Sequence, residues 1–563
     1  MNRREVFVGG ALLGLGLGTG VAAQEFFKPM AARAADPLLN GADILVTNAR
    51  IMTLDPGGRI AQAALVRKGK IVAVGSHAEL RGQARGVQEF DAGGRTVIPG
   101  FVDNHCHVED SCVVGDHQPT LRGTPTIAQM IDKVRARAAT VPKGEWVLMQ
   151  ASAADFPNGV AEKRWLSRED LDKATVDHPV MVVLGIHASI MNTRAWKETG
   201  YWDPNNDRNV KWKGDGHPRM GSVIHRDAEG RPVGLATEVW DFRPGYTVEQ
   251  YKQSMRNHFK EWFLSKGLTS ITTLQDTAPN ELLALQELQQ EGGLPARLRV
   301  YPIAPHAIGV KDLRKVGWRT GFGDDMFRYG GVKFFVDGIG TDFMGKQVYD
   351  PKWTLAGLTE ALTDCQRGGI QTIMHVVTEQ GWALTLDALE AAKKAAPGEL
   401  KHRIDHLTST DDAVIERARR LGVVCGITAP RTRPGSAPGG GAYGRRHRYR
   451  TLAAKKMMIS VLDAAGPGGM YHPMQGVANI IFEQSQGGSA PAGEALTLEQ
   501  AFRSWTLWAA EANFEGHQKG SIEVGKFGDF TVLSEDPAGK PAADVYNITT
   551  PVTIMGGNVV YGG

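Results

Sequence analysis

Short runs in which hydrophobic and β-branched residues alternate with polar ones mark both ends of the chain. Near the start, such runs cover residues 43–46, 50–54, 63–67 and 70–74, and near the end they cover 529–533 and 552–560. Short runs of this kind between Gly- and Pro-containing turns are typical of β-strands. Because strands from opposite chain ends often pair, we expect one small β-sandwich built from residues 42–98 and 520–563.

Between these ends the pattern changes to apolar runs that are followed by longer, helix-like stretches, for example at 358–367 and 382–394. The apolar runs end near residues 107, 274, 304, 338, 375, 406, 427 and 463. Eight strand–helix units are the number found in a (β/α)8, or TIM, barrel. The pattern therefore predicts an α/β barrel over residues 99–519.

The first of these units is much longer than the others, since about 150 residues separate His107 from the next strand. The intervening chain has a helical pattern of its own at 127–137, a strand at 180–184 and hairpin-like pieces at 220–235. We interpret this stretch, about 110–260, as a large insertion after the first barrel strand. Loops at that end of a barrel surround the active site, so the insertion is expected to shape a pocket.

The first 35 residues have the composition of a targeting segment. Arg3 and Arg4 precede an apolar, Gly-rich run at 8–23, which is short and Gly-rich for a membrane span, and 32–34 offers a small-residue cleavage site. We predict a twin-arginine-type signal peptide at 1–35, with the twin-arginine export machinery as a partner and a periplasmic or secreted, bacterial location. A membrane anchor or an N-terminal helix of the domain is the alternative.

Composition excludes some classes of protein. The 563 residues include 64 Lys and Arg against 61 Asp and Glu, a net charge of +3, so no nucleic-acid partner is expected. The four cysteines form no CxxC pair, which argues against a structural zinc knot. A disulfide between Cys106 and Cys112 stays open, although Cys106 lies between two histidines in a strand.

Those two histidines are the first candidates for chemistry. His105 and His107 lie two residues apart at the end of an apolar run, so their side chains share one face of a strand. Two imidazoles on one face can bind one divalent ion. A lone pair of this kind is weak evidence, but its place at the end of the first barrel strand strengthens it.

Several segments together resemble the amidohydrolase superfamily. PGFVDNHCH at 99–107 is similar to its metal-binding signature, and GSIEVGKFGDFTVL at 520–533 is similar to its C-terminal segment. GGVKFFVDG at 330–338, TIMH at 372–375 and HRIDH at 402–406 resemble the YtcJ-like, type 3 branch, which is related to N-substituted formamide deformylases. The resemblance covers essentially the whole mature chain.

The resemblance implies further metal ligands. Lys333 matches a lysine that becomes carboxylated and bridges metal ions; the alternative is a barrel lysine paired with Asp337. His375 and His406 match the histidines that end the fifth and sixth strands. His402 shares the strand parity of His406 but lies lower in the barrel, and we interpret it as structural.

The resemblance also implies a general base and a pocket. Asp463 matches the aspartate that ends the eighth strand, binds metal weakly and takes a proton from the metal-bound water. Here the chain departs from the family, because Val461 and Leu462 replace a glycine and a serine, and 376–379 lacks the usual glycine–aspartate. Glu238 and His187 resemble residues of the family's insertion and are candidates for the substrate pocket.

The implied activity is hydrolysis of a non-peptide carbon–nitrogen bond in a small molecule, by a hydroxide bound to one or two divalent ions, zinc first among them. A lactone, carbamate or ester hydrolase would use the same site. A non-catalytic periplasmic binding or regulatory protein on a decayed scaffold is the alternative from another class. The sequence leaves open whether the chain forms a homo-oligomer.

A stretch at 429–450 is rich in Pro, Gly and Arg. One interpretation is a solvated loop. The other is a lid whose arginines meet an anionic substrate.

Overall fold

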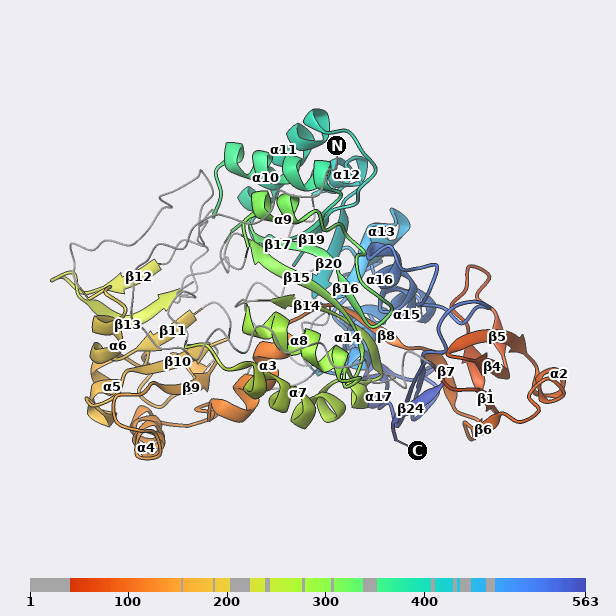
Figure 1. Ribbon diagram of the computed structural model, residues 1–563, viewed down its shortest axis with the longest axis horizontal. Coiled ribbons are helices and arrows are strands. Elements are labelled where there is room, and N and C mark those ends of the chain that lie inside the picture. The colour runs from red at the N-terminus through yellow and green to blue at the C-terminus, as the bar shows by residue number, and fades with distance from the viewer. Residues whose placement is uncertain are drawn as a thin grey trace, which may run out of the picture.

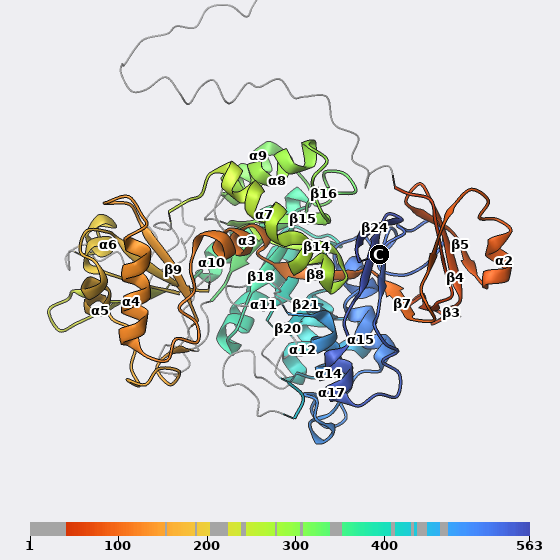
Figure 2. The same cartoon turned by 90° about the horizontal axis from the view of Figure 1, so that it is seen from below.

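The computed structural model describes residues 41–152, 155–185, 188–202, 223–237, 244–275, 279–304, 308–337, 352–406, 411–428, 433–435, 447–461 and 471–562. Three parts lie in a row: an insertion at one end, a barrel in the middle and two small sheets at the other end (Figures 1 and 2). None of the described helices is long and apolar enough to cross a membrane.

The central part is a nearly closed barrel of eight parallel strands, with β21 lying beside β8. In sheet order the strands are β8 (Phe101–Cys106), β14 (Leu268–Gln275), β15 (Arg297–Ala304), β17 (Gly331–Phe335), β18 (Gln371–His375), β19 (Arg403–Asp405), β20 (Val424–Thr428) and β21 (Met458–Val461). A short strand, β16 (Phe327–Tyr329), pairs with the N-terminal half of β15. All eight strands fall where the apolar runs predicted them, so the TIM-barrel prediction is confirmed.

Helices surround the barrel, and polar caps begin several of them. Thr354, Thr378 and Asp411 each accept a backbone hydrogen bond at the start of α10, α11 and α12. The helices are α3 (Val108–His117), α7 (Val248–Trp262), α8 (Asn280–Gln290), α9 (Val310–Val316), α10 (Leu355–Gly368), α11 (Glu379–Ala395), α12 (Asp412–Arg420), α13 (Tyr449–Ala454), α14 (Pro473–Ile481), α15 (Leu498–Ser504) and α16 (Leu507–Ala512), with 3-10 turns η3 (Leu264–Lys266) and η5 (Gln484–Gln486). The largest hydrophobic core fills the space between the strands and these helices.

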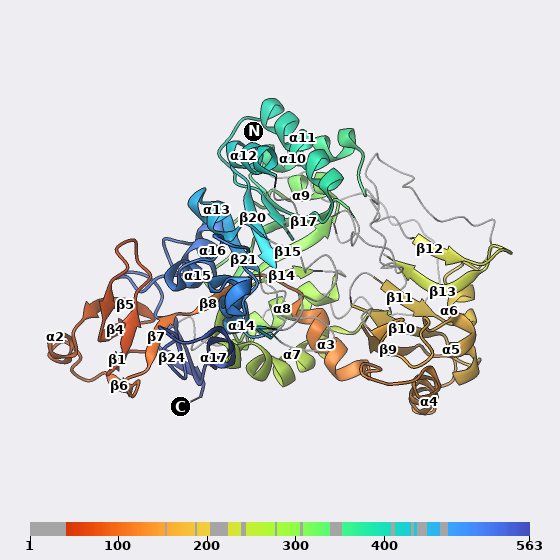
Figure 3. The same ribbon diagram turned by 180° about the vertical axis from the view of Figure 1, so that it is seen from behind.

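The insertion follows β8 and α3, which leads from the barrel toward it (Figure 3). It holds a five-stranded sheet in the order β12 (Val223–Arg226), β13 (Pro232–Thr237), β11 (Ala188–Met191), β10 (Val180–Leu184) and β9 (Val147–Ala151). Its helices are α4 (Ile127–Ala138), α5 (Arg168–Ala174) and α6 (Thr193–Glu198). Separate hydrophobic cores cover the two faces of this sheet.

The two ends of the chain pair in the sheets at the far side of the barrel. One sheet has the order β5 (Lys70–Gly75), β4 (Ala63–Arg67), β1 (Ile44–Thr47) and β6 (Gln88–Asp91). The other has the order β24 (Asn558–Tyr561), β23 (Val552–Met555), β22 (Phe530–Val532), β7 (Thr96–Pro99), β2 (Arg50–Met52) and β3 (Ile60–Ala61). Two short helices, α2 (His77–Arg81) and α17 (Ala542–Asn547), complete this part. The pairing of β22 with β7 joins the ends, as the sequence predicted.

The four cysteines are all buried, and none of them forms a disulfide. Cys106 and Cys112 both pack in the core between the barrel and its helices. The Cys106–Cys112 disulfide that the sequence left open is therefore not formed.

Candidate metal centre

Four histidines meet at the carboxyl ends of three barrel strands. His105 lies in β8 and His107 follows it directly, His375 is the last residue of β18, and His406 follows the last residue of β19. All four side chains are buried. The carboxyl ends of parallel strands open on one face of the barrel, which is where TIM-barrel enzymes keep their active sites.

The four rings form a continuous chain of contacts. The ring centres of His107 and His105 are 5.7 Å apart, those of His105 and His406 are 4.6 Å apart, and those of His406 and His375 are 4.7 Å apart. With zinc–nitrogen bonds of about 2.1 Å and tetrahedral angles, two imidazoles on one ion have ring centres about 5 Å apart. The spacing of these rings therefore fits a shared divalent ion.

Two of the rings have a hydrogen-bond partner at Nδ1. The Nδ1 atom of His105 lies 2.9 Å from a carboxylate oxygen of Asp405, and that of His406 lies 3.0 Å from the hydroxyl of Thr428. Metal-binding histidines characteristically use one ring nitrogen for such a partner and the other for the metal. Because these partners are at Nδ1, Nε2 is the ring nitrogen with which both residues would bind an ion.

His406 enters the cluster because of its backbone. Along β19, Ile404 packs in the core against the helices, whereas Arg403 and Asp405 contact residues inside the barrel. Strict alternation would turn His406 outward with Ile404. His406 instead has a φ of 66°. A left-handed conformation costs a non-glycine residue about 1–3 kcal/mol, and such strain is concentrated at functional sites.

The electrostatics of the cluster favour a neutral imidazole at His105. Burial lowers the pKa of His105 well below its usual value, and the nearby Lys333, His107, Arg403 and His375 lower it further. A neutral imidazole is the form that binds a metal ion. The donor set and its charge state therefore suit zinc or a similar divalent ion.

Lys333 lies in the middle of β17 and is completely buried. Its Nζ lies 5.1 Å from the ring centre of Phe335, whose ring centre is 5.0 Å from that of His375. The carboxylate of Asp337 accepts hydrogen bonds from Val377 and Thr378.

Within the described residues, no three His, Cys, Asp or Glu side chains are close enough to hold an ion as they stand. The fit of a metal therefore rests on the spacing of neighbouring pairs of rings and on the neutral state of His105. Three predicted site residues, Asp463, His187 and Glu238, lie outside the described residues, as does much of the 429–450 segment. At the end of that segment, Arg448 bonds to Asp412 and Glu494.

The sequence interpretation missed Asp405, Arg403 and Thr428. Arg403 donates to the Asp405 carboxylate over 2.8 Å and to the backbone oxygen of Asn104 over 2.7 Å, so it fixes the carboxylate that holds His105. A signal for this pair was available. Arg403 and Asp405 are charged residues at alternate positions of a strand that is otherwise predicted to be buried.

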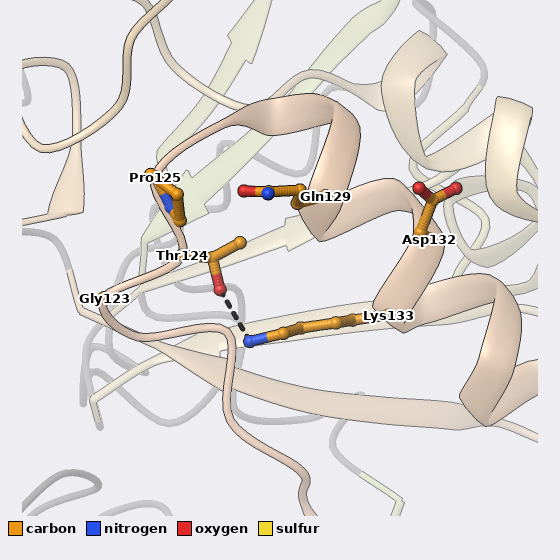
Figure 4. Close-up of a pocket in the computed structure, with 6 residues that line it drawn as sticks. All are labelled: Gly123, Thr124, Pro125, Gln129, Asp132 and Lys133. Atoms are coloured by element: carbon orange, nitrogen blue, oxygen red, sulfur yellow. Dashed lines mark hydrogen bonds between the residues drawn. The ribbon is translucent and has the colours of Figure 1, made fainter.

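A surface pocket of about 350 Å³ lies elsewhere, on the insertion (Figure 4). It is lined by Gly123, Thr124, Pro125, Gln129, Asp132 and Lys133. Lys133 donates to the Thr124 hydroxyl over 2.9 Å, and the Glu162 carboxylate already accepts from the backbone at the start of α4. These groups satisfy one another, so the chemistry is assigned to the histidine cluster.

Comparison with known proteins agrees with this geometry. The chain is 24% identical over 556 residues to an N-substituted formamide deformylase from Arthrobacter pascens, covering 92% of this chain and 98% of the relative. It is 23% identical to the protein YtcJ of Bacillus subtilis (strain 168), covering 91% of this chain and 98% of YtcJ. A solved metal-dependent hydrolase from Pyrococcus horikoshii OT3 has the same fold, with a TM-score of 0.65, 18% identity and coverage of 89% of this chain and 99% of that one. The profile of the amidohydrolase family matches residues 88–561, and the chain therefore belongs to the amidohydrolase family.

Proposed function

We propose that this metal-dependent hydrolase of non-peptide carbon–nitrogen bonds binds one or two zinc ions through His105, His107, His375 and His406. The observation that carries the proposal is the chain of four imidazoles, two of them fixed through Nδ1 by Asp405 and Thr428. Nitrogen donors of this kind suit zinc better than hard ions such as magnesium. A carboxylated Lys333 would add an oxygen donor.

The remaining groups divide the chemistry between them. A bound divalent ion would acidify a water molecule and polarise the carbonyl of the substrate. Asp463 takes the proton of the attacking water as general base and returns it to the leaving nitrogen. The buried strand ends around His105 and His375 hold the reacting groups away from bulk solvent.

The substrate class is proposed from the relatives. One of them is named for hydrolysis of N-substituted formamides, and the chain spans nearly all of its length. We propose an N-acyl or N-formyl amine as the substrate, with Glu238 and His187 of the insertion lining the pocket. Lactones, carbamates and esters would be attacked by the same activated water.

Location is a separate proposal, since it rests on residues 1–35 alone. We infer that Arg3 and Arg4 direct the folded protein to the periplasm or the exterior through the twin-arginine machinery. Fusion of residues 1–35 to a reporter tests this in a bacterium. Export that survives in an Arg3→Lys, Arg4→Lys variant, or in a host without that machinery, would contradict it.

The activity is tested by a hydrolysis screen of zinc-loaded protein against formamides, N-acyl amines, cyclic amides, carbamates and lactones. The expected result is turnover of an amide that is lost with a chelator, restored by zinc and absent in Asp463→Asn. Metal analysis on the same sample separates the alternatives: one to two equivalents of zinc support an enzyme, and a metal-free, inactive protein supports a binding or regulatory role.

A further inference from the structure

Asp337 lies two residues beyond the end of β17 and is completely buried. Its carboxylate accepts three hydrogen bonds from the connection that follows β18. The backbone of Val377 donates to Oδ1 over 2.9 Å, and the backbone and hydroxyl of Thr378 donate to Oδ2 over 2.9 and 2.7 Å. One carboxylate thus binds two successive residues of the neighbouring strand–helix unit.

These contacts continue the pairing of β17 with β18 past its last step. The ladder ends with Phe335 opposite His375, and the backbone of Val336 then donates to the oxygen of His375 over 3.0 Å. The bonds that Val377 and Thr378 donate to Asp337 come next, two and three residues after His375. The backbone on the carboxyl side of this histidine is therefore fixed to β17 as firmly as the strand before it.

The start of α11 is built around the same carboxylate. Thr378 is the N-cap of α11 and accepts from the backbone of Gly381 over 2.9 Å while it donates to Asp337. A Cβ atom on Gly381 would lie 2.1 Å from Oδ2 of Asp337. Only glycine leaves room for the carboxylate at this position, so the contact is specified from both sides.

Burial raises the pKa of Asp337 to about 6, although the hydrogen bonds from Thr378 and Val377 and the charge of Lys352 oppose the rise. Burying a carboxyl group costs free energy unless hydrogen bonds compensate it. At Asp337 the three bonds from Val377 and Thr378 supply that compensation. Its strongest contacts are to the segment at 376–378, where the chain also departs from the family pattern.

We propose that Asp337 is a positioning residue that directs His375 toward the other three imidazoles by fastening residues 377 and 378. We call Asp337, Thr378 and Gly381 the clasp. The proposal rests on the proposed metal site, since it holds that the clasp orients one ligand of that site. A ligand that is free to rotate loses metal affinity, because the protein must order it during binding.

A matched set of variants tests the proposal. Thr378→Val removes the hydroxyl from the clasp at nearly constant volume, and Thr378→Ser restores it. Thr354→Val is the control, because Thr354 caps the neighbouring α10 through the same contact, to the backbone of Gly357, without touching Asp337. Asp337→Asn is a second variant that keeps the shape of the side chain and removes its charge.

The measurements are zinc affinity by chelator competition and the visible absorption spectrum of the cobalt-substituted full-length protein, both at pH 8, where Asp337 is ionised. We expect Thr378→Val and Asp337→Asn to weaken zinc binding about 10- to 100-fold and to change the cobalt spectrum, as loss of a ligand's support does. Thr378→Ser and Thr354→Val should keep the wild-type spectrum and affinity.

Unchanged affinity and spectrum in a folded Thr378→Val protein would overturn the proposal, even if its melting temperature fell. So would an equal loss in Thr354→Val, because that result would indicate a general effect of helix capping. Failure of the proposed function is distinguishable from both outcomes: the wild-type protein itself would then bind no zinc, and His375→Ala would bind as little.

Discussion

The barrel buries polar side chains at both of its ends, and the two ends use them differently. At the end away from the histidines, which we call the floor, Arg299 and Arg403 both donate hydrogen bonds to Asn513, directly after α16. At the end that carries the histidines, which we call the rim, the four imidazoles lie with Lys333. There the pKa of His105 is well below its usual value. The floor brings opposite charges together, whereas the rim brings together imidazoles, among them His105 with its lowered pKa.

The floor balances its charges internally. Nζ of Lys519 lies 2.8 Å from Oε2 of Glu515, and Nη1 of Arg299 lies 3.7 Å from Oε1. Burial alone would raise the pKa of Glu515, but Lys519, Arg299 and Arg328 outweigh it and lower the pKa to about 2. The carboxylate of Glu515 thus finds its counter-charges within the protein itself.

Arg403 and Asp405 connect the two ends. Arg403 bonds to the floor through Asn513 and Asn104 and to the rim through Asp405, which holds His105. Glu515 therefore has structural partners, whereas Asp405 orients an imidazole of the cluster. Four substitutions test this distinction.

The largest effect is expected at the rim. His107→Ala should abolish zinc binding and lower kcat by on the order of 1000-fold or more, because a metal supplies several kcal/mol of transition-state stabilisation. The thermal unfolding of the metal-free variant should match that of metal-free wild type. Full activity after complete removal of the metal would contradict the metal mechanism.

The next effect is on stability and belongs to the floor. Glu515→Gln should lower the free energy of unfolding by about 3–5 kcal/mol, because it leaves buried cations without their counter-charge. Since the folded pKa of Glu515 is lowered from 4.5 to about 2, its contribution is present above pH 4.5 and is lost as the pH falls toward 2.

Denaturant unfolding between pH 7 and pH 3 measures both parts of this prediction. The variant should be less stable at pH 7 and should lose less stability than wild type on acidification. Zinc affinity of the folded variant should stay unchanged. A large loss of affinity would show that the floor and the rim are not separate in function.

A smaller effect is expected where the two ends meet. Asp405→Asn should weaken zinc binding about 10- to 100-fold, because the amide orients His105 less firmly than the carboxylate. Asp364→Asn is a matched control, since it removes the ion pair between Asp364 of α10 and Arg314 of α9. Equal zinc affinity in the two variants, measured by chelator competition, would remove Asp405 from the metal centre.

The smallest effect is expected at His402, the other histidine of the HRIDH segment. Its Nδ1 lies 2.8 Å from the hydroxyl of Thr372 and its Nε2 lies 2.8 Å from the side-chain oxygen of Gln366, on the helix side of the sheet. Burial lowers its pKa to about 3. His402→Gln should cost about 1–2 kcal/mol of stability and leave zinc affinity and kcat unchanged. Loss of metal would contradict its structural role.

Local sequence patterns were enough to predict the barrel strands and to propose candidate metal ligands on them. Apolar runs separated by turns are local patterns, and they placed all eight barrel strands, including β8 with its paired histidines. The motifs around Lys333, His375 and His406 are likewise read from a few neighbouring residues. Local spacing sufficed because strand period and parallel order bring such residues to one end of a barrel.

The contacts that hold these candidate ligands in place could not be predicted from the sequence. Asp405 meets His105 across 300 positions of the chain, and Asp337 meets Thr378 across 41, distances over which no local pattern reports a contact. The left-handed backbone of His406 reverses the alternation that the sequence implies, because packing around the site outweighs a local preference of a few kcal/mol. The orientation of the His105 and His406 rings therefore depends on contacts that form only once the barrel has closed.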